Sequence, residues 1–523
     1  METKTSMYDF MFRRFEQKKN TAALGFLYKK FTFKRLKEEA DKAASAFAAY
    51  GLEKGDTVTL ALPNIPTAVS AFYGANKIGL TVNLVHPLAP YSQLKETMVK
   101  TNSKLLLAID IVLDKYFNEV TADGFKVVCC KAEDWLKFPA NAVVALFGKK
   151  RCKNITKHEN LIFAKKFFSG KVTAVKEDFA WDETRIIMHS GGTTSLPKSI
   201  MLSGLNFNAV ASATIEVIGK DRPVNGEAMI AVLPMFHCFG LGVTFHTALS
   251  YGYQAALIPK YSPKAIVKVM RKNKNVTMIS GVPTMFKGMV GQKGFDGKHL
   301  SRMEFAFCGG DKLSPALKAR FDEAMIKHGS PCRLDEGYGL TETSGVIAVN
   351  RRGNRRDGSV GKALGDCIVK AFDGELCVSG DVVMKGYLEA GESVFFEHEG
   401  KKFVKTGDIG TVDGDGYIFM KTRIKRMIKV SGVNVYPAEA ENVILQIAGV
   451  NECVVVGRPH PHKGAEAVAF VVADSALENE IKKQCAIHLN KWTAPKQIVF
   501  LDKIPLTNLG KPDYKVLEQK AEK

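Results

Sequence analysis

The sequence predicts an α/β protein: a large N-terminal domain of parallel-sheet subdomains plus a small β-barrel, and a smaller α+β C-terminal domain. Three observations support this prediction. Strand-like apolar runs alternate with amphipathic helices as far as about Asn350, which is typical of βαβ units and a mostly parallel sheet. Glycine and short β runs become frequent after that point. A strongly basic segment at 421–429 then precedes a new α+β pattern.

The first βα units are predicted before residue 110. An apolar stripe at helical spacing runs through 33–50 and stops at Gly51, which indicates a helix and its end. The next elements are strand 57–62, helix 68–77, strand 80–85, helix 91–101 and strand 104–109. Residues from about 135 to 180 are basic and weakly patterned, so we expect a connection there.

The alternation resumes around a loop near residue 195. The run 185–188 is largely apolar and β-branched and predicts a strand, and 199–201 predicts another. The later elements are helix 205–218, strands 228–233 and 254–258, helix 263–272, strand 276–280, a helix from Thr284, strand 304–308, helix 315–327 and a short strand near 332–335. Short strands at 375–379 and 417–420 in the glycine-rich region predict the β-barrel.

Composition narrows the class of protein. The 46% hydrophobic and 24% charged residues are ordinary for a globular protein, and no apolar run is long enough to span a membrane. The N-terminus lacks an apolar signal core, and the ten cysteines include one adjacent pair, Cys129–Cys130, but no C-x-x-C. We therefore expect a cytoplasmic protein with reduced thiols rather than a secreted or zinc protein.

The net charge of +20 is unusual. It suggests a nucleic-acid partner, but the lysines are spread along the chain and no nucleic-acid-reading module is recognisable. A phosphorylated ligand, peripheral contact with an anionic membrane, and a basic solvated exterior are alternative explanations that the sequence leaves open. It also leaves open whether the chain is a monomer or a homodimer.

The loop near residue 195 has the composition of a phosphate-binding site. The segment 188–203 has the sequence MHSGGTTSLPKSIMLS. Its glycines permit close backbone approach, its hydroxyls and backbone N–H groups can bind an anion, and its lysine adds a compact positive charge. These residues are Ser190, Gly191, Gly192, Thr193, Thr194 and Lys198. They favour a polyphosphate ligand.

Two other interpretations of this loop are a solvated surface loop and a Walker A motif. Composition alone does not separate a surface loop from a binding site. The Walker A pattern is missed by one residue, because Pro197 stands where its glycine belongs. Proline has no N–H to give a phosphate, and a strand rather than a helix is predicted after Lys198. We therefore reject Walker A, and no kinase signature is present.

The loop resembles the signature S/T-S/G-G-T-T-G-x-P-K-G of the adenylate-forming superfamily, which includes acyl- and aryl-CoA synthetases, luciferases and adenylation domains. Ser195 and Ser199 stand where glycine is usual. Further motifs follow in family order, and the resemblance covers about residues 30–515. It implies that the loop holds the β- and γ-phosphates of ATP. It also implies an N-terminal domain of residues 1–422 and a mobile C-terminal domain of residues 423–523, with a hinge near Lys425.

The stretch 234–240, PMFHCFG, resembles the family's second motif, whose aromatic–His pair borders the carboxylate pocket. On that resemblance His237 is a catalytic candidate that orients the acyl carboxylate; a histidine that only packs is the alternative. The motif has no aspartate, which argues for a plain organic acid rather than an amino acid. The candidate pocket residues are Phe236, His237, Phe239, Gly240, Gly281 and Gly309.

The stretch 336–343, EGYGLTET, resembles the family's Y-G-x-T-E motif. There the aromatic, Tyr338, stacks on adenine, Thr341 contacts the α-phosphate as a second catalytic candidate, and Glu342 binds Mg²⁺. A carboxylate oxygen suits this hard cation, which neutralises charge as pyrophosphate leaves. Thr406-Gly407-Asp408 resembles the family's T-G-D, whose aspartate binds the ribose hydroxyls. The remaining ATP-binding candidates are Gly310, Asp311, Glu336, Gly337, Gly339 and Arg423.

Two C-terminal segments complete the resemblance. Ser431 and Gly432 lie in the turn that meets the pantetheine arm of coenzyme A in CoA ligases. The stretch 505–511, PLTNLGK, matches the closing P-x-T-x-x-G-K motif. Its lysine, here Lys511, reaches the substrate carboxylate and the α-phosphate, and is the third catalytic candidate.

The resemblance implies an ATP-dependent ligase that joins a fatty or aryl acid to CoA through an acyl-adenylate, uses ATP, Mg²⁺ and coenzyme A, and releases AMP and pyrophosphate. Small residues at several pocket positions favour an acid larger than acetate. An acyl-carrier-protein ligase or stand-alone adenylation enzyme would share the ATP motifs, and a luciferase-type enzyme would share the fold. A basic nucleic-acid-binding protein would explain the charge but not the ordered motifs.

Overall fold

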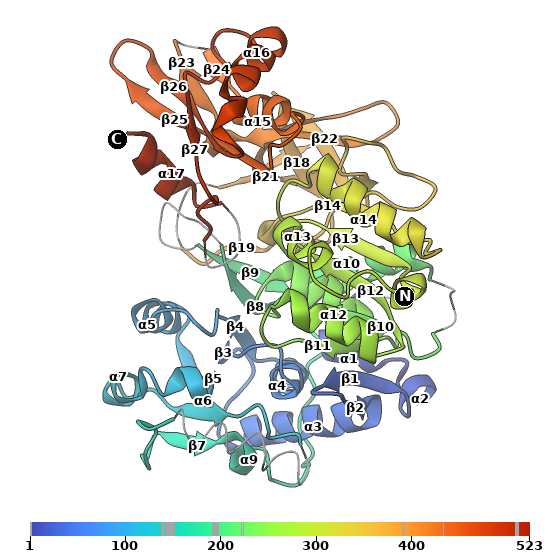
Figure 1. Ribbon diagram of the computed structural model, residues 1–523. Coiled ribbons are helices and arrows are strands. Elements are labelled where there is room, and N and C mark those ends of the chain that lie inside the picture. Colours follow the sequence, from blue (N-terminus) through green and yellow to red (C-terminus); the bar gives the residue numbers. More distant parts are fainter. Residues whose placement is uncertain are drawn as a thin grey trace.

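The computed structural model describes residues 3–136, 142, 152–190, 198–220, 222, 224–389, 391, 393–431, 433–507 and 512–522. Within these residues the chain forms four sheets, and three of them precede residue 424. The fourth sheet, with its helices, lies at one end of the molecule beside β18, β21 and β22 (Figure 1).

The first large sheet has eight strands in the order β19-β9-β8-β4-β3-β5-β6-β7. Their bounds are β3 Thr57–Ala61, β4 Thr81–Leu84, β5 Ser103–Ile109, β6 Val127–Cys130, β7 Leu161–Phe163, β8 Thr184–His189, β9 Ser199–Ser203 and β19 Gly386–Tyr387. The strands from β8 to β7 are parallel, and β9 and β19 add an antiparallel edge. The predicted strand–helix alternation is confirmed here.

The second large sheet has nine strands in the order β16-β15-β14-β13-β12-β10-β11-β1-β2. Their bounds are β1 Ala22–Phe26, β2 Lys29–Thr32, β10 Ala228–Ala231, β11 Gln254–Leu257, β12 Val276–Gly281, β13 Phe305–Cys308, β14 Leu334–Tyr338, β15 Ala348–Val349 and β16 Lys362–Ala363. Its centre is parallel and both of its edges are antiparallel. The short strand predicted near 332–335 is in fact β14, which runs on to Tyr338.

Helices pack on both large sheets (Figure 1). They are α1 Met7–Phe12, α2 Phe15–Lys18, α3 Phe33–Ala49, α4 Pro66–Lys77, α5 Tyr91–Lys100, α6 Asp110–Leu113, α7 Phe117–Ala122, α9 Ala164–Phe167, α10 Gly204–Ile218, α11 Ala248–Ser250, α12 Pro263–Lys272, α13 Pro283–Val290 and α14 Pro315–Lys327. A π-helix, η1 Phe239–Thr247, and the 3-10 turns η2 Lys298–Arg302 and η3 Thr341–Thr343 complete this part. One apolar core joins residues of both sheets, and a second lies under α12, α13 and α14.

The packing of α3 on α4 follows from the sequence. Thr32 caps α3 by accepting the Arg35 backbone N–H, and the predicted apolar stripe of α3 is buried. Gly74 in α4 meets this stripe, where an added Cβ would lie 2.6 Å from the carbonyl oxygen of Ala40. The two helices can approach so closely only because position 74 has no side chain.

The small β region is an open antiparallel sheet rather than the predicted barrel. Its strands are β17 Ile368–Phe372, β18 Glu375–Ser379, β20 Phe395–His398, β21 Lys401–Val412 and β22 Ile418–Arg423. The long strand β21 pairs with β18, β20 and β22, and in the described residues no ladder joins β17 or β22 to β20. Short strands and frequent glycine indicate a small antiparallel sheet, but they do not determine whether its edges meet.

The C-terminal unit is α+β, as predicted. Its elements are η4 Ile424–Arg426, β23 Ile428–Val430, β24 Val433–Val435, α15 Pro437–Leu445, β25 Glu452–His460, β26 Gly464–Val472, η5 Ser475–Leu477, α16 Glu478–His488, β27 Gln497–Phe500 and α17 Tyr514–Ala521. Apolar clusters cover both faces of its sheet. This unit therefore has its own core.

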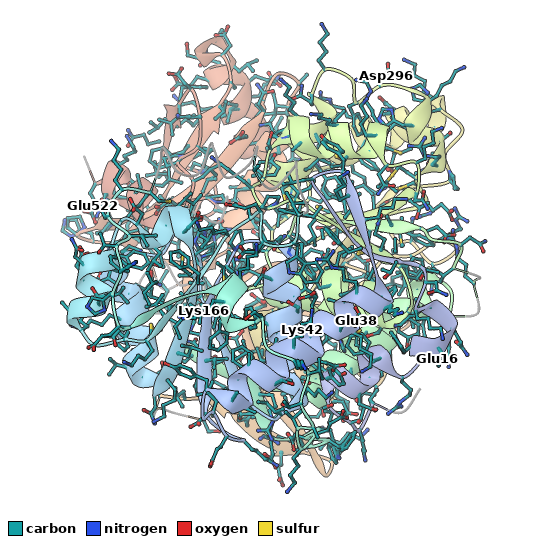
Figure 2. The ribbon with its side chains drawn as sticks, turned by 90° about the horizontal axis from the view of Figure 1, so that it is seen from below. Glu16, Glu38, Lys42, Lys166, Asp296 and Glu522 are labelled. Atoms are coloured by element: carbon teal, nitrogen blue, oxygen red, sulfur yellow. The ribbon has the colours of Figure 1, made fainter. Side chains whose placement is uncertain are left out.

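Charges of both signs share the outer face that α3 and α9 form. Figure 2 shows Glu38 and Lys42 of α3 and Lys166 of α9 on that face. Lys42 also forms an ion pair with Glu39 at 3.2 Å. Within the part of the chain that the structure describes, no helix combines the length and the apolar character that crossing a membrane requires.

Candidate active site

The carboxyl ends of parallel strands from both large sheets open on one cleft of about 3130 Å³. His86, Ser190, Pro234, Gly309 and Gly339, which follow β4, β8, β10, β13 and β14, all line it. Residues of β21, β22 and the C-terminal unit also line it. In open α/β sheets, ligands bind outside the carboxyl ends of the strands, so this is the expected place for a site.

The phosphate loop is closed at its base by Ser190 and Lys198. The Ser190 N–H donates to the Lys198 carbonyl at 2.9 Å, and the Ser190 hydroxyl accepts the Lys198 N–H at 3.0 Å. The strands β8 and β9 flank the loop, as predicted. The other proposed phosphate ligands, Gly191, Gly192, Thr193 and Thr194, lie outside the described residues.

Ser199, one of the two departures from the family pattern, is accommodated in extended backbone at the start of β9. It is fully buried, and its N–H donates to both carboxylate oxygens of Glu389, at 2.9 and 3.1 Å. Burial favours the neutral form of Glu389 and would raise its pKa. The hydrogen bonds from Ser199 outweigh this effect and lower the pKa of that carboxyl. Serine therefore fits here without backbone strain. Ser195 is outside the described residues.

The second motif leads from β10 into the π-helix η1. The Phe236 ring lies 4.7 Å from the rings of His86 and of His237, measured between centroids. The Phe239 ring lies against Gly309, where an added Cβ would be 3.5 Å from it. These aromatic residues and Gly309 all line the cleft, so the structure brings most of the predicted pocket together.

Two predicted pocket glycines do not line the cleft. A Cβ on Gly240 would lie 2.0 Å from the carbonyl oxygen of Pro234, and one on Gly281 would meet Met285 and Phe286 at 3.0–3.1 Å. Gly240 thus permits the close turn from Pro234 into η1, and Gly281 faces α13. Neither contributes surface to the cleft.

The third motif forms the end of β14 and the turn η3. The Tyr338 hydroxyl donates to Asp408 Oδ2 at 2.7 Å, and Arg423 Nε lies 2.9 Å from Asp408 Oδ1. Burial, reinforced by the nearby Asp408 carboxylate, raises the pKa of Tyr338 well above its usual value, so the phenol keeps its proton. The proposed adenine-stacking and ribose-binding side chains are therefore bonded to each other beside the cleft.

The other residues proposed to bind adenine and phosphate surround the Tyr338–Asp408 pair. Gly310 has a φ of +81°, a left-handed conformation that favours glycine, and Asp311 follows it. The Glu336 carboxylate accepts the Leu313 N–H at 3.2 Å, and burial raises its pKa. Gly337 pairs with Val349 in the ladder. A Cβ on Gly339 would lie 2.3 Å from the Gly345 carbonyl oxygen.

Thr341 and Glu342 form the start of η3 and line the cleft. The Thr341 carbonyl accepts the Cys238 thiol at 3.7 Å, which links this motif to the second one. Mg²⁺ in nucleotide sites typically uses one or two carboxylates and completes its shell with phosphate oxygens and water. The Glu342 carboxylate at the cleft wall fits that requirement.

Three segments of the C-terminal unit contain predicted site residues. Lys425 is exposed in the turn η4, next to Arg426, which pairs with Glu441 at 2.5 Å. Ser431 has a φ of +52° and does not line the cleft; Gly432 is outside the described residues. Lys511 is also outside them, but Thr507 and Pro512 on either side of it line the cleft.

These motifs follow one another in family order along the chain, and residues from them line one cleft. Together they define an enzyme of the adenylate-forming class. The family model of the AMP-binding enzyme matches residues 11–388, and that of the AMP-binding enzyme C-terminal domain matches residues 439–511. The chain belongs to this family of AMP-binding enzymes, within its acyl-CoA synthetase branch. It is an AMP-forming acid–thiol ligase.

Individual relatives cover nearly the whole chain. A long-chain-fatty-acid–CoA ligase of Salmonella typhimurium (strain LT2) is 30% identical over 509 residues, covering 92% of this chain and 88% of the relative. The long-chain-fatty-acid–CoA ligase of Bacillus subtilis (strain 168) is 28% identical over 512 residues, covering 94% and 90%. The structure of ATP-bound MatB from Rhodopseudomonas palustris, 22% identical, has the same fold, with a TM-score of 0.84 and 99% of each chain covered.

Proposed function

We propose that this enzyme joins a long-chain fatty acid to coenzyme A in two steps. The carboxylate oxygen of the acid attacks the α-phosphorus of ATP and pyrophosphate leaves, giving an acyl-adenylate. The thiol of CoA then loses its proton and attacks the acyl carbon, and AMP leaves as the thioester forms. The observation that carries the proposal is the convergence of Lys198, His237, Tyr338, Glu342 and Asp408 on one cleft.

Each site residue has a separate role in the proposed reaction. The 190–198 loop holds the β- and γ-phosphates, Tyr338 stacks on adenine and Asp408 binds the ribose, with Arg423 beside it. Thr341 contacts the α-phosphate, and Mg²⁺, when bound at Glu342, supplies charge neutralisation of the phosphates. His237 orients the acyl carboxylate. Because no covalent enzyme intermediate is needed, positioning and charge carry the first step.

The second step involves the C-terminal unit. Residues 1–422 and 423–523 move as two bodies about Lys425, which withdraws Lys511 from the acyl-adenylate and brings the Ser431–Gly432 turn to the pantetheine arm of CoA. The exposure of Lys425 in a short 3-10 turn between two independent cores supports this division. Two side-chain contacts join the two parts in this structure, Lys287 with Glu452 and Lys312 with Asn442.

The names of the relatives and the lining of the cleft both support a fatty acid. The cleft wall between α10, η1 and β13 presents Val217, Val243, Phe239 and Phe307, which suit an acyl chain. An aryl acid is the competing substrate, because a probable 4-coumarate–CoA ligase of Dictyostelium discoideum is 28% identical to this chain over 529 residues.

The test is a panel of carboxylic acids, from medium-chain and long-chain fatty acids to aryl acids, incubated with ATP and CoA. We expect AMP and thioester to form fastest with the long-chain acids. ADP as the product would overturn the mechanism, and AMP release independent of CoA would indicate a carrier-protein acceptor. Preference for an aryl acid would overturn only the substrate assignment.

A cytoplasmic location is part of the proposal. All ten cysteines are free thiols and nine of them are buried, which suits a reducing compartment. Peripheral membrane contact and the choice between monomer and homodimer stay predictions of the sequence.

A further inference from the structure

The short strand β19 adds a tyrosine to the edge of the phosphate loop. In the antiparallel pair of β19 and β9, Tyr387 stands opposite Ile200, and Lys198 lies two residues before Ile200. Side chains two residues apart in extended chain share a face, so Lys198 and Tyr387 are diagonal neighbours, within reach of a long cation and an aromatic ring. The Lys198 Nζ lies 4.2 Å from the centroid of the Tyr387 ring.

The same tyrosine also contacts the proposed metal ligand. Its hydroxyl donates to Glu342 Oε1 at 2.9 Å. The Tyr387 side chain thus contacts a cation with its ring face and an anion with its hydroxyl.

Backbone contacts fix both ends of this bridge. The Met384 N–H donates to the Glu342 carbonyl at 2.9 Å, and the Leu388 N–H donates to the Ser199 carbonyl at 2.8 Å. Glu389 then accepts the Ser199 N–H. The segment 384–389 therefore joins the lysine end of the phosphate loop to the turn that carries Glu342, although the three pieces are far apart in sequence.

We propose that Tyr387 is a positioning residue that couples Lys198 to Glu342, so that the phosphate-binding lysine and the metal-binding carboxylate are held for one MgATP. The inference rests on the proposed role of Glu342. The hydroxyl restricts the rotation of the Glu342 carboxylate and leaves its other oxygen to face the metal. The ring keeps the Lys198 ammonium beside the loop through cation–π attraction. Each half of the side chain therefore has a separate effect.

The variants Tyr387→Phe and Tyr387→Leu distinguish the effect of the hydroxyl from the effect of the ring. ATP binding to the full chain is measured by calorimetry without carboxylic acid, once with EDTA and once with Mg²⁺. For Tyr387→Phe we expect the Kd of ATP without metal to stay within about twofold of wild type. The factor by which Mg²⁺ lowers this Kd should fall about fivefold or more, because a hydrogen bond to a charged group is lost. Tyr387→Leu should in addition weaken metal-free binding about threefold.

Turnover gives a second readout. In Tyr387→Phe the Mg²⁺ concentration for half-maximal AMP formation should rise about fivefold, while kcat at saturating Mg²⁺ stays within twofold of wild type. The matched control is Tyr417→Phe, because Tyr417 also carries cations over its ring, Arg356 at 4.2 Å and Lys362 at 4.5 Å, and donates its hydroxyl to Asn354. It does not line the cleft and should leave both readouts unchanged.

A parallel Glu342→Gln variant separates this inference from the proposed function. If Glu342→Gln loses the Mg²⁺ tightening while Tyr387→Phe keeps it in full, the coupling is wrong and the role of Glu342 stands. If Glu342→Gln keeps the tightening, the metal role of Glu342 is wrong and the inference is overturned with it.

Discussion

At the scale of single residues, Lys198 is the clearest test of the phosphate loop. Its backbone N–H closes the loop base and the residue lines the cleft, so Lys198→Ala should raise the KM for ATP roughly tenfold through loss of a charge-assisted contact. The KM for the acid should stay within about twofold. Initial rates of AMP formation with each substrate varied in turn measure both. A rise confined to the acid KM would show that the lysine does not serve the phosphates.

Gly240 tests a steric requirement. Because an added Cβ would lie 2.0 Å from the Pro234 carbonyl oxygen, Gly240→Ala must displace backbone at the entrance to η1. We expect a loss of about 1–3 kcal/mol in the free energy of unfolding, measured by urea denaturation. The control is Gly414→Ala, where nothing lies within 4 Å of the added Cβ and φ is not positive. Equal losses in the two variants would contradict the steric argument.

The sequence could identify the motif residues but not all of their neighbours. Lys198, Tyr338, Glu342 and Asp408 lie in patterned stretches, and each of them lines the cleft. Tyr387 and Glu389 carry no pattern that was recognised, and they reach the site only through the β19–β9 pairing. The sequence predicts Gly240 as pocket surface, because a glycine can either leave room for a ligand or allow two backbone segments to pack closely. The sequence does not distinguish these two roles.

At the scale of elements, the main feature that the sequence did not predict is the π-helix η1. Helices are recognised by an apolar stripe on one face, but residues 240–247 are buried on all sides. Its polar members pair inside the protein: Thr244 with Ser280 at 2.7 Å, and His246 with Tyr73 and Asn208 at 3.0 and 2.8 Å. π-Helices are rare and occur at functional sites, and this one begins at the pocket residue Phe239.

The His246 network fixes the imidazole as neutral. Asn208 donates its amide N–H groups to the carbonyls of Thr3 and Thr5, so its oxygen must accept the His246 Nε2–H. The other ring nitrogen, Nδ1, is left to accept the Tyr73 hydroxyl. Burial lowers the pKa of His246 to about 3. A second proton would have no acceptor.

This network makes the fold sensitive to acid. The unfolded chain takes up a proton at His246 near its ordinary pKa of about 6.5 and the folded chain does not, so stability is present above that pH and falls below it. Between pH 7.5 and 5, His246 should remove about 2 kcal/mol from the free energy of unfolding. Burial also lowers the pKa of His189, to about 4, which acts in the same direction.

Urea unfolding at the two pH values measures the effect. His246→Gln should be less stable than wild type at pH 7.5 but should lose about 2 kcal/mol less on going to pH 5. The matched variant is His488→Gln, which removes an exposed imidazole of α16 and leaves the His246 network intact. An unchanged pH dependence in His246→Gln would mean that the imidazole is not kept neutral by the fold.

At the scale of the whole molecule, strand–helix alternation predicts parallel-sheet α/β subdomains, and the basic segment 421–429 with the new pattern after it predicts the C-terminal α+β unit. The alternation could not predict the order of strands, because β1 pairs with β11 and β19 with β9 across more than a hundred residues. The barrel prediction failed for the same reason: closure depends on which edges meet. Local patterns determine elements, whereas sheet order and edges depend on contacts between distant segments.

The two-body proposal makes a prediction that depends on Lys511. Lys511 is outside the described residues, but Thr507 and Pro512, on either side of it in the sequence, line the cleft. If the C-terminal unit then turns away about Lys425, Lys511 serves only the first half-reaction. Lys511→Ala should therefore reduce acid-dependent exchange of pyrophosphate into ATP by at least about a hundredfold. Conversion of preformed acyl-adenylate and CoA to thioester should stay within about threefold of wild type.

Lys425→Pro is the complementary variant, because proline fixes φ at a position that must rotate. It should leave pyrophosphate exchange nearly intact and slow thioester formation from preformed acyl-adenylate. Radiolabelled pyrophosphate exchange and rapid-quench thioester assays measure the two half-reactions separately. Equal loss of both half-reactions in Lys511→Ala would mean that the lysine acts in both steps, and the assigned alternation of the C-terminal unit would then be wrong. The opposite defects of the two variants would together show that one cleft is used twice, in two arrangements of the same two bodies.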